Sequence, residues 1–315
     1  MPLALPEGSW ALILGGSSGF GLATAHQLSR HGVNLCLVHR DRRGAMRRIQ
    51  PDFDAIRERG VTLLTFNEDA LDSEVRGNIL DGLESALGED SKVRVLLHSI
   101  AFGNPKLVAP EVRPETAART ALAEALGVDE TRLAETVDRL FADGLDQLGG
   151  LTTPPTYSDE SFIEEEDLQR TIHAMGTSLL GWTKELHRRG LFAADARVFG
   201  LTSEGNAVAW KGYAAVAAAK VALESLARSI AVEYAPFGIR CNIVQAGITD
   251  TPALAAIPGS DHMKAQARLR NPFHRLTTPR DVANVIYLLA TDEAAWINGE
   301  VVRVDGGEHI SGVTQ

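Results

Sequence analysis

The stretch at residues 10–32 constrains this chain more than any other. A short apolar run at residues 11–14 leads directly into the glycine-rich turn GGSSGFG at residues 15–21, and a helical pattern follows. A buried strand, a tight turn and a helix start point backbone N–H groups and the positive end of the helix at one place, which suits a phosphate. The glycines are spaced G-x3-G-x-G, not G-x-G-x-x-G. We expect this unit to bind a pyrophosphate; an ordinary strand-to-helix turn is the alternative.

Strand-like and helix-like segments alternate along the chain. This order predicts an α/β fold, a doubly wound parallel sheet with helices on both faces. Further strands are expected at residues 33–38, 61–66, 93–97, 197–201, 240–244 and 301–304. A long helix is expected at 213–234, and Thr278 followed by Pro279 marks another helix start. We therefore predict a single domain over residues 1–315.

Residues 105–167 differ in character from the rest. They hold five basic and fifteen acidic residues, a net charge of −10, whereas the remaining chain holds 26 of each sign. The pattern predicts a helix that stops at Gly127 and a second helix capped by Asp129. We interpret the segment as an acidic helical insertion within the domain. It is a lid over the binding pocket, a subunit contact or a solvated decoration, and its second helix carries an apolar stripe of Leu133, Val137, Leu140 and Phe141.

Composition narrows the classes of partner. The net charge of −10 argues against nucleic-acid binding. No apolar run approaches the length of a membrane helix, and no basic start leads into a long apolar segment, so we expect no membrane partner and no signal peptide. Cys36 and Cys241 lie in strand-like runs and are expected to be buried reduced thiols. We expect a cytoplasmic protein.

The residues after the second predicted strand bear on the choice of cofactor. An acidic residue closing that strand would bind the ribose 2′-OH of NAD. This chain instead has His39 and Arg40, with Arg42 and Arg43 just beyond and Asp41 among them. Cations suit a 2′-phosphate, so the segment favours NADP(H) over NAD(H). A solvated basic loop is the alternative.

Two more polar segments follow strands. Asp69 and Ala70 come after the third strand, where a short polar side chain can accept a hydrogen bond from an adenine amino group. The same segment can equally cap the helix expected at residues 73–87. Residues 98–103 follow the fourth strand, at the carboxyl edge where such sheets bind ligands.

Taken together, these motifs resemble the short-chain dehydrogenase/reductase family over nearly the whole chain. The matching pieces are GGSSGFG at 15–21, Asp69-Ala70, the strand ending in Ser203, Lys220 in its helix, and VDGG at 304–307. The acidic insertion has no counterpart in this resemblance.

One branch of that family is more similar than the rest. The usual family pattern places a tyrosine four residues before the lysine, but that position is Val216, and Tyr213 lies seven residues before Lys220. This spacing, HSIAF at 98–102 and Ala246-Gly247 resemble the enoyl-acyl-carrier-protein reductases, and the NADPH-preferring members in particular. A departure is Ser203, where many enoyl reductases carry a second tyrosine.

The resemblance implies a Rossmann-like fold and a homotetramer acting on an acyl thioester, with acyl carrier protein as one carrier, in fatty acid biosynthesis and lipid metabolism. It also implies a set of residues that bind the cofactor: Gly15, Ser17, Ser18, Gly19, Phe20, Gly21, Arg40, Asp69, Ala70, Ser99, Ile100, Ala101, Lys220, Gly247, Thr249 and Thr251.

The chemistry of such a reduction assigns roles to three side chains. Hydride addition at C3 of an enoyl thioester puts negative charge on the thioester oxygen, and a donor aimed at that oxygen stabilises it. Tyr213 is the candidate donor, Lys220 lies near the same helix face two turns on, and Ser203 is expected to add a hydrogen bond. The alternatives are an aromatic side chain that covers a helix start, a surface charge and a strand-end cap, respectively. We therefore predict NADPH-dependent reduction of the C2=C3 bond of an enoyl thioester. The alternatives are a ketoacyl or alcohol dehydrogenase and a non-catalytic NADP(H)-binding sensor or scaffold.

Overall fold

Seven parallel strands form one sheet in the computed structural model, which describes residues 4–88, 91–112, 116–157 and 162–312. The strand order is β3-β2-β1-β4-β5-β6-β7, and every neighbouring pair is parallel. This confirms the doubly wound fold. The strands are β1 (Ser9–Leu14), β2 (Asn34–His39), β3 (Leu63–Asn67), β4 (Lys92–His98), β5 (Phe192–Ser203), β6 (Ile239–Ala246) and β7 (Val301–Val304).

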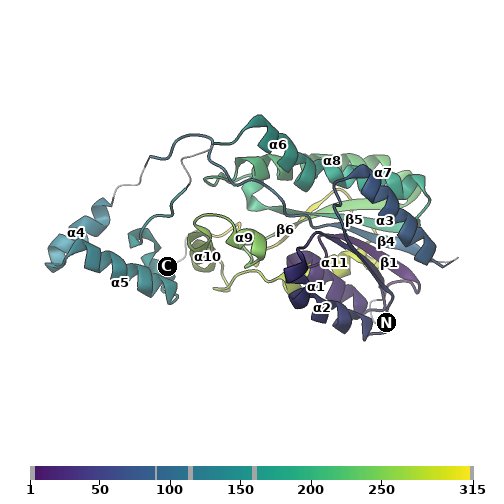
Figure 1. Cartoon of the computed structure of the whole chain (residues 1–315), viewed down its shortest axis with the longest axis horizontal. Coiled ribbons are helices and arrows are strands. Elements are labelled where there is room, and N and C mark those ends of the chain that lie inside the picture. Colours follow the sequence, from purple (N-terminus) through teal and green to yellow (C-terminus); the bar gives the residue numbers. More distant parts are fainter. Residues whose placement is uncertain (1–3, 89–90, 113–115, 158–161, 313–315) are drawn as a thin grey trace.

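Helices cover both faces of the sheet (Figure 1). One face carries α1 (Gly19–Ser29), α2 (Arg43–Arg57) and α11 (Pro279–Ala290). The other carries α3 (Ser73–Ala86), α7 (Ser178–Arg188) and α8 (Ala214–Glu233). The predicted helix start at Thr278 is confirmed, because its side chain and that of Asp281 form a capping box.

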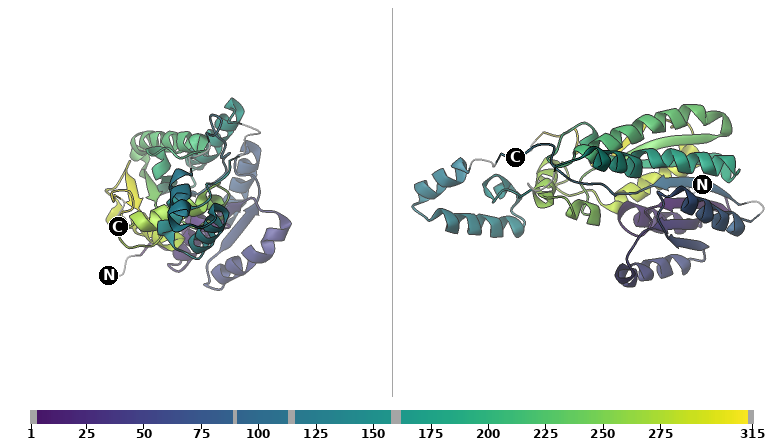
Figure 2. Two further views of the ribbon diagram at one scale, coloured as in Figure 1. Left: turned by 90° about the vertical axis from the view of Figure 1, so that its left-hand side faces the viewer. Right: turned by 45° about the horizontal axis from the view of Figure 1, so that its top comes forward.

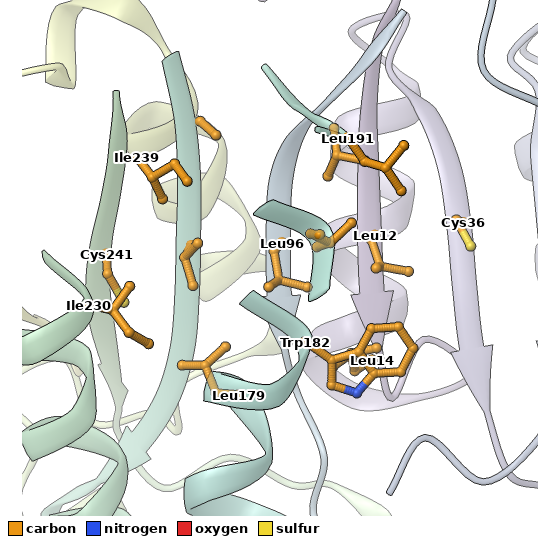
Figure 3. Packing of buried hydrophobic residues seen from close by; sticks show 14 of the residues in the cluster. Leu12, Leu14, Cys36, Leu96, Leu179, Trp182, Leu191, Ile230, Ile239 and Cys241 are labelled. Carbon is orange, nitrogen blue, oxygen red and sulfur yellow. The ribbon is translucent and has the colours of Figure 1, made fainter. Parts of the chain in front are cut away.

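Burial on both faces explains the continuous apolar runs of β1 and β2. In β1, Leu12 and Leu14 pack toward α7, while Ala11 and Ile13 pack toward α1 and α11. Figure 3 shows the first of these cores, with Trp182 of α7 beside Leu14. Cys36 and Cys241 lie in the same core as buried free thiols, as predicted.

The acidic insertion forms a hairpin that projects away from the sheet (Figures 1 and 2). Its helices are α4 (Ala117–Leu126) and α5 (Glu130–Ala142), followed by a 3-10 turn, η1 (Asp146–Leu151). Gly127 ends α4 at a positive φ of 63°, and the Asp129 carboxylate caps α5 by accepting from the Arg132 N–H. Both predicted boundaries are confirmed.

The helical stretch between the insertion and β5 is interrupted. It consists of α6 (Glu165–Ile172), a π-helical turn (His173–Thr177) and α7. A Cβ on Gly176 would lie 2.7 Å from the carbonyl oxygen of Ala219, so this turn packs directly on the backbone of α8. Such π-turns are frequent at functional sites. The remaining helices are α9 (Pro252–Ala255) and α10 (Ser260–Arg270), and none in the described ranges is long and apolar enough to cross a membrane.

Candidate active site

A cavity of about 590 Å³ opens along the carboxyl ends of the strands. This is where open α/β sheets bind ligands, at the point where the strand order reverses between β1 and β4. Every predicted catalytic and cofactor-binding residue lines the cavity except Gly21. The fold thus brings together segments as far apart in the sequence as Gly15 and Thr251.

The glycine turn is shaped for close approach of a ligand. Gly15 and Gly19 adopt positive φ angles of 86° and 53°. A Cβ on Gly15 would lie 2.4 Å from the Ser99 carbonyl oxygen. Ser18 is the N-cap of α1 but its side chain makes no capping hydrogen bond, so first-turn N–H groups remain available to a phosphate.

Gly21 has a different role from the one expected. It does not line the cavity, and a Cβ there would lie 2.0 Å from the carbonyl oxygen of Gly15. Its hydrogen side chain lets α1 pack against the turn that precedes it. Gly21 therefore shapes the site without facing the cavity.

Ser203 and Tyr213 face one another across the cavity wall. Ser203 ends β5, Tyr213 is the N-cap of α8, and their hydroxyl oxygens lie 3.2 Å apart. Burial raises the pKa of Tyr213, and the hydrogen bond with Ser203 opposes that shift only in part. The phenol therefore stays protonated at neutral pH and can act as a hydrogen-bond donor.

Lys220 lies deeper on the same helix. Its Nζ donates to the Leu201 carbonyl oxygen at 2.8 Å. Burial lowers its pKa to about 8, while the negative charge of Glu224 acts in the opposite direction. Glu224 is itself held by Thr202 and Asn206 at 2.5 and 2.6 Å. Lys220 is therefore a largely charged ammonium at neutral pH, positioned beneath the cavity.

Arg40 and Asp69 meet at the other end of the cavity. Arg40 Nη1 donates to Asp69 Oδ2 at 2.6 Å. Asp69 does not cap α3, since Asp72 does so by accepting from two backbone N–H groups. The helix-cap alternative is therefore confirmed for the segment after β3, but at Asp72 and not at Asp69. Of the four cations expected to meet a 2′-phosphate, His39 and Arg40 line the cavity, but Arg42 and Arg43 do not because they begin α2 on the outer surface.

A family model described as Enoyl-(Acyl carrier protein) reductase matches residues 131–309, a range that contains Ser203, Tyr213 and Lys220. The chain belongs to the short-chain dehydrogenase/reductase family, in its enoyl-reductase branch. It is an oxidoreductase of that family, whose fold binds a nicotinamide cofactor.

The chain is similar to individual proteins and solved structures of this family to different extents. The chain is 33% identical over 184 residues to cis-4-hydroxycyclohexanecarboxylate dehydrogenase of Sinomonas cyclohexanicum, covering 57% of this chain and 72% of that protein. It is 30% identical over 148 residues to 3-oxoacyl-[acyl-carrier-protein] reductase FabG of Escherichia coli (strain K12), covering 47% and 60%. The crystal structure of FabI from Candidatus Liberibacter asiaticus superposes with a TM-score of 0.73 at 18% identity, covering 99% of this chain and 100% of that chain, which shows a shared fold.

The apolar stripe of the hairpin lies outside the cavity lining in this structure, since Leu133, Val137, Leu140 and Phe141 are not among the residues that line it. The lid, the subunit contact and the solvated decoration stay predictions for the insertion. The stripe is only partly buried, apart from Val137, and Phe141 packs on His262 of α10 with ring centroids 4.9 Å apart. A single helical stripe was compatible with several surfaces, and local periodicity does not distinguish them.

The hairpin instead contacts α10. The carboxylate of Asp146 accepts two hydrogen bonds from Arg268, at 2.5 and 2.6 Å. Thr152 Oγ1 lies 2.6 Å from Nε2 of His262. The next residue, Met263, lines the cavity. The insertion therefore braces a helix that forms part of the cavity wall.

Sequence reasoning missed the apolar part of the wall. The side chains that supply it come from the π-turn, the loop before α8, α8 itself and the segment after β6: Met175, Trp210, Val216, Ile257 and Met263. It also missed the partner of His98, whose Nε2 lies 2.8 Å from Ser178 Oγ and whose pKa is lowered to about 3 by burial. No local pattern marks these residues, because they are ordinary helix and loop positions brought together by the fold.

Proposed function

We propose that this protein reduces the C2=C3 double bond of an enoyl thioester with NADPH. The observation that carries the proposal is the position of the cavity's phenol. Tyr213 faces the cavity at the start of α8, and the wall position four residues before Lys220 is Val216, which has no proton to donate. The donor is thus set back from where the proton donor to a carbonyl oxygen is usual in this family.

The residues act by stabilising charge on the thioester oxygen. The nicotinamide, when bound, would supply a hydride to C3, and a proton taken up from solvent at C2 would complete the reduction. The Tyr213 O–H donates to the oxygen on which negative charge develops, and Ser203, 3.2 Å away, orients that hydroxyl. The Lys220 ammonium adds positive potential from beneath and is oriented by the Leu201 carbonyl. Because Lys220 is buried and Tyr213 and Ser203 are partly buried, their electrostatic effect is screened less than it would be in water.

The cavity wall supports an acyl substrate. Met175, Trp210, Val216, Ile257 and Met263 give it an apolar lining beside Tyr213. An alkyl chain gains about 0.8 kcal/mol for each buried CH₂ group, so such a wall favours acyl over small polar substrates.

The preference for NADPH rests on Arg40 at the end of β2. Its guanidinium can form a bidentate pair with the 2′-phosphate of NADPH. The ribose hydroxyl that NADH has at this place cannot form such a pair. The ion pair with Asp69 has to reorganise for this, at small cost, because both side chains are 40% exposed or more.

We further propose a homotetramer acting in fatty acid biosynthesis, with acyl carrier protein or coenzyme A as carrier. The exposed apolar side chains Val221 and Val232 on α8 support a subunit contact on that helix. Light scattering of the purified protein measures the particle mass, and a monomer would overturn this part of the proposal.

Carbonyl reduction is the second candidate, favoured by Ser203 in place of a second tyrosine. NADPH oxidation with a crotonyl thioester and with an acetoacetyl thioester separates the two. We expect the crotonyl thioester to be reduced and the acetoacetyl thioester to be spared. The reverse result would establish the second candidate, and no oxidation with either would favour a sensor or scaffold.

Tyr213→Phe tests the role of the phenol. We expect turnover of the crotonyl thioester to fall on the order of 100-fold, with NADPH binding retained, because one such donor contributes about 3 kcal/mol to the transition state. Steady-state kinetics and NADPH fluorescence measure the two quantities. Turnover at the parent rate would remove Tyr213 from the mechanism.

A further inference from the structure

Two guanidinium groups lie over one aromatic ring at the cofactor end of the cavity. The ring is that of Phe102, which follows β4 and lines the cavity. Arg40, at the end of β2, and Arg170, in α6, each place their guanidinium carbon 5.1 Å from its centroid. The two charges are therefore no more than about 10 Å apart, although the two residues are far apart in the sequence.

The two arginines differ in how their charge is balanced. Arg40 is paired with the Asp69 carboxylate at 2.6 Å. Arg170 has no ion pair with any of the residues that the structure describes, and its contact is the face of Phe102. The acid one turn before it, Asp167, is already bound by Lys106 and Asn104, each at 2.6 Å. Arg170 thus supplies the uncompensated positive charge of this cluster.

We propose that Arg170 is a second recognition residue for the phosphate that distinguishes NADPH from NADH. A 2′-phosphate carries close to two negative charges, whereas Arg40 brings one positive charge that the nearby Asp69 carboxylate offsets. An arginine that is always charged and presents a planar fork of donors complements it. Phe102 lines the cavity and contacts both guanidinium groups, since a cation is attracted to a ring face; Arg170 itself is exposed and lies outside the cavity lining, next to this ring. This inference rests on the NADPH preference proposed above.

Binding of nucleotide fragments isolates this end of the cavity from catalysis. We would measure 2′,5′-ADP and 5′-ADP by titration calorimetry, since the two differ in the position of one phosphate. Arg170→Gln is expected to weaken 2′,5′-ADP about tenfold, the effect of losing one charged hydrogen bond, and to change 5′-ADP less than twofold. Arg132→Gln, which removes an exposed arginine from the hairpin, is the matched control and should change neither.

Arg170→Met keeps an apolar contact with Phe102 and removes only the charge. It is expected to match Arg170→Gln. If Arg170→Met bound 2′,5′-ADP like the parent protein, or if Arg170→Gln weakened both nucleotides equally, Arg170 would be a packing residue and the inference would be overturned.

If the protein does not prefer NADPH at all, the nucleotide-binding measurements give a different result. In that case the parent protein would bind 2′,5′-ADP and 5′-ADP alike, whatever stands at position 170. If the parent discriminated, and Arg40→Gln but not Arg170→Gln abolished the discrimination, the preference would stand and the role of Arg170 would fall.

Discussion

The sheet body and the α4–α5 hairpin are stabilised in different ways. In the body, the side chains of β1 from Ala11 to Leu14 are fully buried, and two apolar cores enclose the sheet. In the hairpin helices, only Ala123 and Val137 are buried. The body also has a balanced charge, whereas the insertion carries the whole net charge of −10.

This difference means that the polar groups of the cavity are held rigidly, whereas the apolar wall on α10 is held more loosely. The cavity's polar groups are mounted on buried strand ends and on α8, which hold Ser203, Tyr213 and Lys220 in fixed positions. One apolar wall, by contrast, belongs to α10, which the hairpin holds through polar contacts near the surface. Such contacts contribute little to global stability. We therefore expect substitutions in the body to affect folding and catalysis, and substitutions in the hairpin to affect only the position of α10.

The largest expected effect compares two buried side chains. Leu12→Ala should lower the free energy of unfolding by about 3 kcal/mol, because it leaves a cavity in a close-packed core. Val137→Ala should leave the main urea transition unchanged, since α5 buries little else. Denaturation followed by circular dichroism measures both. Equal shifts in the two midpoints would mean that hairpin and body unfold as one unit.

A second effect concerns the buried charge in the body. Burial lowers the pKa of Lys220 to about 8, so the ammonium dominates below that pH and is lost above it. We expect kcat/KM for NADPH, which reports on the free enzyme, to fall about tenfold per pH unit above pH ~8. In the kcat profile the fall should begin at a higher pH, because the negative phosphates of the bound cofactor stabilise the ammonium. A flat kcat/KM profile up to pH ~10 would show that the charge on Lys220 does not matter for this reaction.

The smallest effect tests the brace on α10. Arg268→Gln removes the ion pair with Asp146. It should raise KM for the acyl thioester about threefold and leave kcat and the KM for NADPH unchanged. Arg139→Gln, in a neighbouring exposed position of α5, is the control. Asp146→Asn should reproduce the change. If KM stayed at the parent value in both variants, the hairpin would be decoration with respect to this substrate.

Local patterns in the sequence predicted what depends on neighbouring residues. The inner strands were readable because burial on both faces makes each a continuous apolar run, as in residues 11–14 and 35–38. The helix boundaries at Gly127, Asp129 and Thr278 followed from capping chemistry that acts within four residues. Tyr213 and Lys220 were found because their spacing is a local property of one helix.

Contacts between distant segments were decided only by the tertiary structure. The stripe on α5 was visible in the sequence, but a helical period says which side is apolar and not what covers it, so its packing on α10 was missed. Gly21 was recognised as part of the turn, but its role in packing against Gly15 depends on how the turn folds back. The approach of Arg40, Phe102 and Arg170 joins β2, the loop after β4 and α6. No periodicity encodes such a meeting, because it depends on the order of strands in the sheet and on the path of the helices between them.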